Sequence, residues 1–314
     1  IATNIISFIV HLFLTLLLTL AACDSPPPNA PVPEVPPAPE TPVVTIDAAE
    51  QETQRLNAWL DEQYDEQLDF SPMTRTQLGD KTDYDKLDQA SEAASAEQLN
   101  WLRNSVATMR DQFDYELLTE DGKLSYDMWA FTLSQEEAAQ PWWGHDYIFG
   151  RGGPHSFLPS FMISYHNVET EADLQAYIAR LRDMDRMLGQ LLERALDSAA
   201  NGVRQPAFGY DFALTEIDRV TSGVPFNTSD DTPNSPLWTD FQTKAEGLVN
   251  AEILDDAELQ SYLAEARDVL AGEVLTAYQE VRDWLEADRQ FADEQARGVW
   301  ALPDGEAYYN HRLN

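Results

Sequence analysis

Cysteine and basic residues are scarce in this sequence, and each scarcity excludes a class of protein. The 314 residues include one cysteine, Cys23, so a disulfide framework is excluded. The 20 lysines and arginines are outnumbered by 55 aspartates and glutamates, which gives a formal net charge of −35. Because such a surface repels phosphate backbones, no nucleic acid is expected as a partner. The acidic surface is expected to keep the protein soluble.

Familiar catalytic motifs are also missing. No two of the five histidines are four residues apart, so the sequence contains no His-Glu-x-x-His zinc helix. It has no Gly-x-Ser-x-Gly elbow and no Walker loop, and residues 150–153 are interpreted as an ordinary loop. Glu136 and Glu137 are sequence neighbours on different sides of a predicted helix, which indicates a solvated helix end. We therefore assign no catalytic residue and no metal ligand within this chain.

An apolar run from Ile5 to Ala22 precedes the cysteine. An apolar stretch followed by small residues is typical of a signal peptide. Leu20-Ala21-Ala22-Cys23 resembles the lipobox of bacterial lipoproteins, and this resemblance implies a diacylglyceryl group on the Cys23 sulfur and cleavage before it. An uncleaved membrane anchor is the alternative, since the apolar run is about long enough to span a bilayer.

The residues on either side of this signal affect where the protein is expected to reside. No Met and no basic residue precedes the apolar run, so we expect the natural N-terminus to lie upstream of Ile1. Asp24 follows the cysteine, as in enteric lipoproteins that are retained in the inner membrane. The predicted location is the cell envelope, with the protein lipid-anchored to a bacterial membrane and facing the periplasm or exterior, and with the inner membrane favoured.

Proline dominates the stretch after the cysteine, where it accounts for nine of the 22 residues from Asp24 to Thr45. Proline fixes φ and removes a backbone donor, so the stretch is predicted to be an extended spacer of roughly 70 Å. A docking site for a proline-binding module is the alternative. The predicted organisation is a signal peptide over 1–22, a lipidated cysteine and Pro-rich tether over 23–45, and a helical domain over 46–314.

Helical spacing of apolar residues characterises the domain, which shows no sustained strand-type alternation and no repeat. One helix is expected to begin at a capping-box pattern formed by Asp47 and Glu50. Further helices are predicted over about 95–113, 125–139, 171–199 and 256–287, the third of them stopped by Asn201-Gly202. The predicted fold class is all-α, with packed antiparallel helices.

Two regions are predicted to be non-helical. Residues 141–166 are dense in aromatic residues, glycine and proline, and are expected to form an ordered loop inside the domain. Residues 222–238 are polar and are expected to lie on the surface. His145, His155 and His166 fall in the first region, and each is expected to be packed or exposed without a catalytic or metal-binding role.

Three stretches carry a resemblance to a known family. They are Phe149-Gly150 followed by residues 156–161, then His166-Asn167-Val168 with residues 176–181, and finally residues 298–309. In this order and spacing they resemble the bacterial family labelled domain of unknown function 885. The resemblance covers about residues 46–314, and its most specific part is the stretch Leu-Pro-Asp-Gly-Glu-Ala-Tyr-Tyr that ends at Tyr309.

The resemblance implies the N-terminal half of a helical zinc-metallopeptidase-like domain, in a family whose members are frequently secreted proteins or lipoproteins. Family members carry a helix with a His-Glu and a later His-His downstream of the Tyr-Tyr stretch, and this chain reaches Asn314 without them. Zinc and peptide substrates are therefore implied only for a full-length protein, and the chain alone is expected to be inactive. The alternatives are a non-catalytic lipoprotein that binds a ligand or partner, or one with a role in envelope structure.

Tyr308 and Tyr309 are the only substrate-binding candidates in the chain. The resemblance implies that they lie near the cleft of the full-length protein. Two adjacent tyrosines could donate hydrogen bonds to a substrate carbonyl or to its developing oxyanion. The alternative is that one tyrosine packs inward while the other covers a helix.

Overall fold

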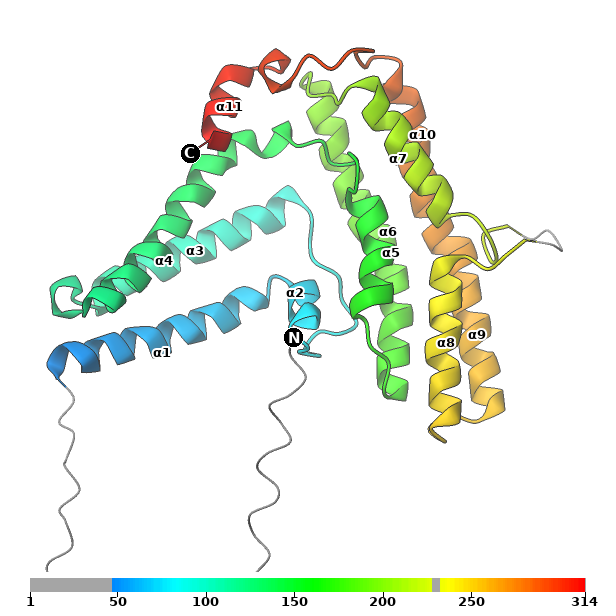
Figure 1. The fold of residues 1–314 in the computed structure, drawn as a ribbon, viewed down its shortest axis with the longest axis horizontal. Coiled ribbons are helices and arrows are strands. Elements are labelled where there is room, and N and C mark those ends of the chain that lie inside the picture. Colours follow the sequence, from blue (N-terminus) through cyan, green and yellow to red (C-terminus); the bar gives the residue numbers. More distant parts are fainter. Residues whose placement is uncertain (1–46, 228–231, 314) are drawn as a thin grey trace, which may run out of the picture. The chain divides into compact units, whose positions relative to one another are not determined.

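The computed structural model describes residues 47–227 and 232–313, drawn in colour in Figure 1. Cys23, Asp24, the predicted signal peptide and the Pro-rich tether lie outside the described residues. Residues 46–314 form one compact unit. Its described residues form helices and no strand beyond an isolated bridge between Val224 and Asn234, so the predicted all-α fold is confirmed. Among these same residues, no helix is both long enough and apolar enough to cross a membrane.

The first helices pack around a small hydrophobic core, which we call the minor core. They are α1 (Ala48–Leu68), α3 (Glu92–Gln112) and α4 (Glu120–Ala139), with a 3₁₀ turn at Tyr115–Leu117. The short α2 (Pro72–Gln77) follows α1 in the chain and contributes Met73 to the larger core described next. The minor core is formed by Leu56, Leu99, Leu102, Val106, Met109, Phe113, Leu118 and Leu133. These apolar residues recur at helical spacing on α3, which explains why this helix forms and which face it buries.

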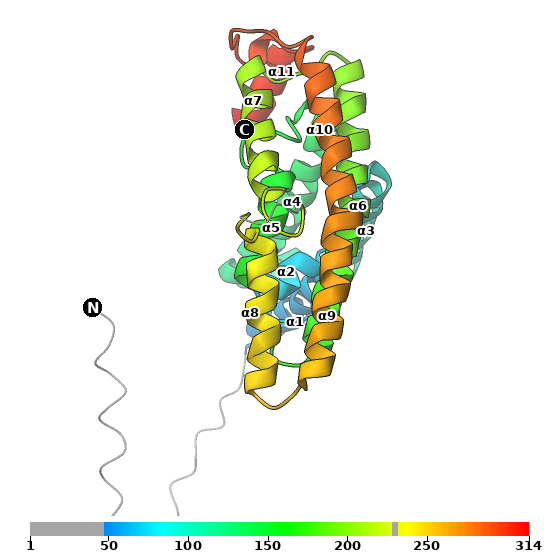
Figure 2. The same cartoon turned by 90° about the vertical axis from the view of Figure 1, so that its right-hand side faces the viewer.

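Most of the remaining helices build a larger core, which we call the major core. They are α5 (Pro154–Tyr165), α6 (Glu171–Ala200), α7 (Ala207–Val220), α8 (Pro236–Asn250), α9 (Asp256–Val269) and α10 (Leu275–Arg289). The short α11 (Gly305–Leu313) comes last and packs outside this core. Figure 2 shows α8 beside α9, and α9 running on into α10. The long helix α6 contributes a continuous buried stripe that includes Leu174, Leu181 and Leu188. This stripe makes α6 the central element of the major core.

The helix predicted over 171–199 is confirmed at both ends. Thr170 caps the first turn of α6 in a capping box with Asp173, which satisfies backbone donors that would otherwise lack partners. The helix ends at Ala200, and Gly202 follows with a φ of +82°, a left-handed conformation that glycine adopts without strain. Local signals were therefore sufficient to place this helix.

Two local predictions were wrong, and a third was confirmed with one irregularity. Asp47 precedes α1, but its side chain makes no capping hydrogen bond, so the predicted capping box does not form there. The helix predicted over 256–287 is interrupted by a π-helical turn at Leu270–Val274. Residues 141–166 are largely helical, because a 3₁₀ helix covers Gln140–His145 and α5 begins with proline at its first position.

Helix α5 contains Pro159, which explains why proline content misled the prediction. Proline has no N–H to give to the carbonyl of His155, four residues earlier. The hydroxyl of Tyr278, from α10, donates to this carbonyl instead at 2.8 Å. The lost backbone hydrogen bond is thus replaced by a side chain that is far away in the sequence.

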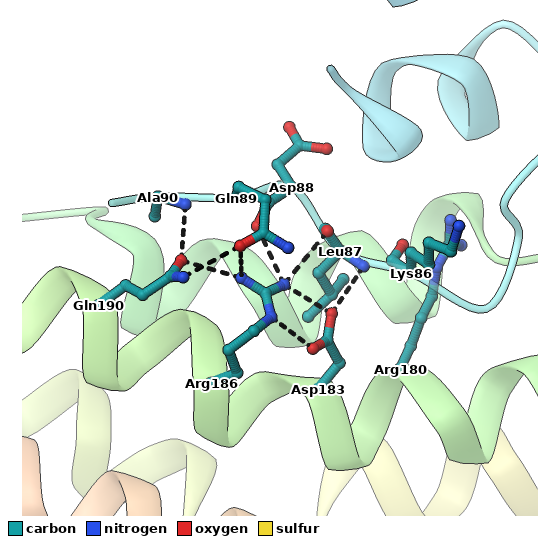
Figure 3. A network of polar contacts seen from close by, with 9 residues as sticks. All are labelled: Lys86, Leu87, Asp88, Gln89, Ala90, Arg180, Asp183, Arg186 and Gln190. Atoms are coloured by element: carbon teal, nitrogen blue, oxygen red, sulfur yellow. Dashed lines mark hydrogen bonds and ion pairs between the residues drawn. The ribbon is translucent and has the colours of Figure 1, made fainter. Parts of the chain in front are cut away.

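A polar network attaches the segment before α3 to α6 (Figure 3). The Leu87 N–H donates to the Asp183 carboxylate at 2.9 Å, and the Ala90 N–H donates to the Gln190 side chain at 2.8 Å. Arg186 donates to the carbonyls of Leu87 and Asp88, at 3.2 Å each. These side chains satisfy backbone groups that belong to neither helix nor sheet, and so they hold the start of α3 against the major core.

Candidate functional site

The short 3₁₀ helix Gln140–His145 follows directly after α4 and lies between α6 and α11 (Figure 1). It carries two adjacent tryptophans with different partners. Trp142 contacts residues of α11, and Trp143 contacts Arg194 of α6. Two candidate sites therefore lie on either side of this short helix.

The first site is an aromatic and histidine cluster, which we define as Trp142, His145, Asp146, Tyr308 and His311. The Trp142 ring lies 5.0 Å from that of His145 and 5.6 Å from that of Tyr308, measured between ring centroids. His145 and Tyr308 are 4.9 Å apart, and His311 stacks on Trp142 at 6.0 Å. Aromatic packing thus joins α11 to the 3₁₀ helix.

The polar atoms of this cluster have few partners. His145 Nε2 lies 2.9 Å from the Pro303 carbonyl, which can only accept, so this nitrogen carries the proton. His145 Nδ1 is then a buried acceptor with no hydrogen-bond partner. The Tyr308 hydroxyl donates to Asp146 over a long 3.4 Å, and burial together with this carboxylate raises the Tyr308 pKa. The cluster therefore offers one unused acceptor and one weakly engaged donor.

The two predicted tyrosines occupy different environments. Tyr308 is 7% exposed and belongs to the cluster, whereas Tyr309 is 50% exposed and lies outside it. Tyr308 is thus packed against other side chains, and Tyr309 is the one that an external molecule could reach. A substrate role for either tyrosine stays a prediction.

His155 and His166 are buried among other partners. His155 Nε2 donates to Glu216 at 3.0 Å, and burial lowers the His155 pKa. His166 donates to the Asp173 carbonyl and accepts from Arg180, each at 2.9 Å. Burial lowers the pKa of His166 to about 3, so it is neutral at physiological pH. Its two ring nitrogens are both used within the fold.

The family resemblance implies zinc ligands outside this chain, and the described residues form no zinc site of their own. Within residues 47–227 and 232–313, no group of three or more histidine, cysteine, aspartate or glutamate side chains could hold a metal ion. Arg180 and the Asp173 carbonyl engage both nitrogens of His166, and such a ring cannot serve as a ligand without losing these bonds. No catalytic step is therefore assigned to a metal on these residues.

The second site is a cavity of about 420 Å³ next to Trp143 and Arg194. It lies where the start of α3, the 3₁₀ helix and the last turns of α6 meet, and its lining includes Glu92, Gln190 and Asp197. Sequence analysis missed this site. Its parts come from three separate stretches, and the adjacent tryptophans of the 3₁₀ helix were the only local signal.

Comparisons with known proteins agree with this fold. The family model described as a bacterial protein of unknown function (DUF885) matches residues 72–314. The chain therefore belongs to this family, which confirms the resemblance found in the sequence. A search of curated proteins found no match.

The fold also resembles a crystal structure of a candidate lipoprotein from Colwellia psychrerythraea. The TM-score is 0.64 at 18% identity, and the match covers 86% of this chain. An identity this low shows a shared fold alone. The match covers 46% of the other protein, so the chain spans about half of its length.

Proposed function

We propose that the chain is the N-terminal helical part of a lipid-anchored envelope protein, whose full-length form hydrolyses peptides outside the cytoplasm. The family match over residues 72–314 supports this proposal, because the resemblance to that family implies a zinc-metallopeptidase-like domain in the full-length protein. The Leu-Ala-Ala-Cys sequence ending at Cys23 supports lipid anchoring, and so does the description of the Colwellia protein as a candidate lipoprotein. Zinc would be held by residues outside this chain.

Exposed apolar surface supports packing against further polypeptide. Leu124, Met128 and Phe131 on α4 are 60%, 62% and 59% exposed, and their spacing places them along one face of the helix. Phe208 and Phe212 form a similar exposed pair on α7. Contiguous apolar surface on a soluble protein marks an interaction site, and the other half of a longer helical protein would cover it.

Tyr309 is the substrate contact that we propose within this chain. Its side chain is half-exposed and its hydroxyl could donate to a peptide carbonyl. Tyr308 acts as a positioning residue, because its ring packs on Trp142 and His145 and so orients α11. The two tyrosines provide a matched pair of variants for testing this division of roles.

Lipid anchoring is tested by metabolic labelling with a radioactive fatty acid, using the gene expressed in a bacterial host. The Cys23→Ser variant should lose the label and keep its signal peptide, whereas Ser25→Ala, two residues on, should be labelled like the wild type. Labelling of Cys23→Ser at the wild-type level would exclude this cysteine as the lipidated residue, and a wild-type protein without label would favour an uncleaved anchor.

Hydrolysis is tested on the full-length gene product with a mixture of fluorogenic peptides, with and without a chelator. Activity should be lost on chelation, and the 314-residue chain alone should show none. The Tyr309→Phe variant should lower kcat/KM by roughly tenfold if its hydroxyl contacts the transition state. Chelator-sensitive hydrolysis by the 314-residue chain alone would contradict the proposed division of the protein.

A non-catalytic, ligand-binding lipoprotein is the second candidate function. The cavity beside Arg194 and Trp143 favours it, since this cavity lies within the described residues and needs no further polypeptide. A full-length protein that binds peptides but does not hydrolyse them, with or without added zinc, would support this second candidate over the first.

A further inference from the structure

Arg194 is an unpaired basic residue in a strongly acidic protein. Arg182 and Arg186, on the same helix, pair with Glu265 and Asp183, whereas Arg194 forms no ion pair with any described residue. Its Nε is buried and has no hydrogen-bond partner. A buried N–H of a charged guanidinium without an acceptor is unfavourable, and an anionic ligand beside it would offset that cost.

Trp143 holds the Arg194 side chain in place. The guanidinium carbon lies 3.7 Å from the centre of the Trp143 ring, in a cation–π contact. A guanidinium stacked in this way keeps its in-plane N–H groups free to donate. Both residues line the cavity of about 420 Å³, which is within the usual size range for a small-molecule site. The arginine is therefore oriented before any ligand arrives.

A smaller cavity, apolar on one side, adjoins the first one. It measures about 110 Å³ and shares Glu92, Gln140 and Trp143 with the larger cavity. Ala96, Leu99 and Ala139 form its apolar side, and Ser95 and Glu136 also contribute to its lining. A ligand that reaches Arg194 with a charged group can thus place a small apolar group on the other side of Trp143.

Carboxylates lie around the same larger cavity. Glu92, Glu193 and Asp197 contribute to its lining together with Arg194. A simple anion would be repelled by these groups, whereas a ligand that also carries an ammonium group would be attracted by them. Positive, negative and apolar features therefore occur side by side.

We propose that this pair of cavities binds an amino acid or short peptide that carries a free C-terminal carboxylate, a free ammonium group and an apolar side chain. Arg194 donates charge-assisted hydrogen bonds to the carboxylate of the ligand, and the acidic residues of the cavity accept hydrogen bonds from its ammonium group. The apolar side chain enters the smaller cavity beside Leu99. The proposal does not depend on peptide hydrolysis by the full-length protein.

Binding is tested by isothermal titration calorimetry of the purified full chain with the dipeptide Leu-Leu and with its C-terminal amide. The dipeptide should bind roughly ten- to a hundredfold more tightly than the amide, because the amide lacks the negative charge and the second acceptor oxygen that the carboxylate offers to Arg194. Equal binding of the two, or no binding of the dipeptide at millimolar concentration, would overturn the proposal. This ligand pair needs no variant, so the test does not depend on whether a mutant folds.

Variants then locate the site. Arg194→Gln should remove the preference for the dipeptide over its amide, whereas Arg110→Gln, at an exposed arginine of α3, should keep it. An Arg194→Gln protein that retains the wild-type preference would overturn the assignment of this arginine.

Free leucine and N-acetyl-leucine distinguish the sources of the carboxylate. Tight binding of leucine indicates an amino-acid site, and tighter binding of Leu-Leu than of leucine indicates a peptide site. Binding of N-acetyl-leucine as tight as that of leucine would overturn the role given to the ammonium group.

Discussion

The major and minor cores differ in how completely they enclose their apolar residues. Among the described residues, the buried part of the major core contains 33 residues from α5 to α10 and nearby segments, and that of the minor core contains eight. On α6, buried apolar residues recur along most of the helix. On α4, Leu133 joins the minor core while Leu124, Met128 and Phe131 remain exposed.

This difference indicates that the two regions obtain their stability in different ways. A large enclosed core supplies most of its own hydrophobic stabilisation. The minor core is too small to do so, and it depends on the polar network of Figure 3 that joins the start of α3 to α6. The exposed α4 face indicates that further polypeptide could add to it. Four experiments, each with its own control, test this comparison.

The largest effect is expected from a cavity in the major core. Leu181 is fully buried, and Leu181→Ala should lower the free energy of unfolding by about 2–5 kcal/mol. Leu102→Ala, the same change in the minor core, should cost less, because a small core with an exposed side can relax around the cavity. Urea unfolding of both variants measures the difference. Equal losses would mean that the two cores are equally enclosed.

Disrupting the polar network between the two cores should have the next largest effect on the free energy of unfolding. Arg186→Met removes the hydrogen bonds to the Leu87 and Asp88 carbonyls and should cost about 1–3 kcal/mol. Hydrogen exchange should show faster opening of α3 than of α6 in this variant. The control Arg182→Met breaks a solvent-exposed ion pair with Glu265 and should cost less than about 1 kcal/mol. Uniform protection across α3 and α6 in Arg186→Met would contradict a joining role.

Lowering the pH should decrease the free energy of unfolding through protonation of His166 in the unfolded state. Burial lowers the pKa of His166 to about 3, while an unfolded histidine has a pKa of about 6.5. The unfolded state therefore binds the extra proton as the pH falls below about 6.5, and stability is lost from there down to about pH 3. The slope contributed by this residue is at most about 1.4 kcal/mol per pH unit. Urea unfolding between pH 7 and pH 4 should show a shallower slope for His166→Asn than for the wild type. Identical slopes would rule out His166 as the group responsible.

The smallest effect on stability is expected on the exposed face of α4. Phe131 is exposed, so Phe131→Ser should change the free energy of unfolding by no more than about 0.5 kcal/mol. The same variant should reduce self-association in sedimentation velocity, because it removes apolar surface. Phe161→Ser, in the buried part of α5, is the matched change and should be strongly destabilising. A large loss of stability in Phe131→Ser would show that the α4 face is already covered.

The sequence predicted the helical fold class and the family, because both depend on local patterns. The stripe on α6 and the stop at Asn201-Gly202 act within a few turns of one helix. The Pro154–Tyr165 helix was missed because Pro159 argues against it locally, and its compensation comes from Tyr278 in another helix. The capping pattern at Asp47 was misleading, since the residue types were present but the side-chain bond was not.

The candidate sites were only partly predictable. The Leu-Pro-Asp-Gly-Glu-Ala-Tyr-Tyr stretch pointed to Tyr308 and Tyr309, but nothing local distinguished the packed tyrosine from the exposed one. Arg194 was not singled out at all. Its importance depends on a buried Nε without a hydrogen-bond partner and on the contact with Trp143, which is distant in the sequence.

The sequence by itself determined the acidic character of the chain, the helical class and the family, since composition and short-range periodicity are sufficient for these. Only the tertiary structure decided which aromatic side chain meets which partner, and that Arg194 carries a buried N–H without a hydrogen-bond partner. Those features depend on side chains from α3, α6 and α11 meeting around one short 3₁₀ helix. Contacts between segments that are distant in the sequence depend on how the whole chain packs, so local sequence patterns do not predict them.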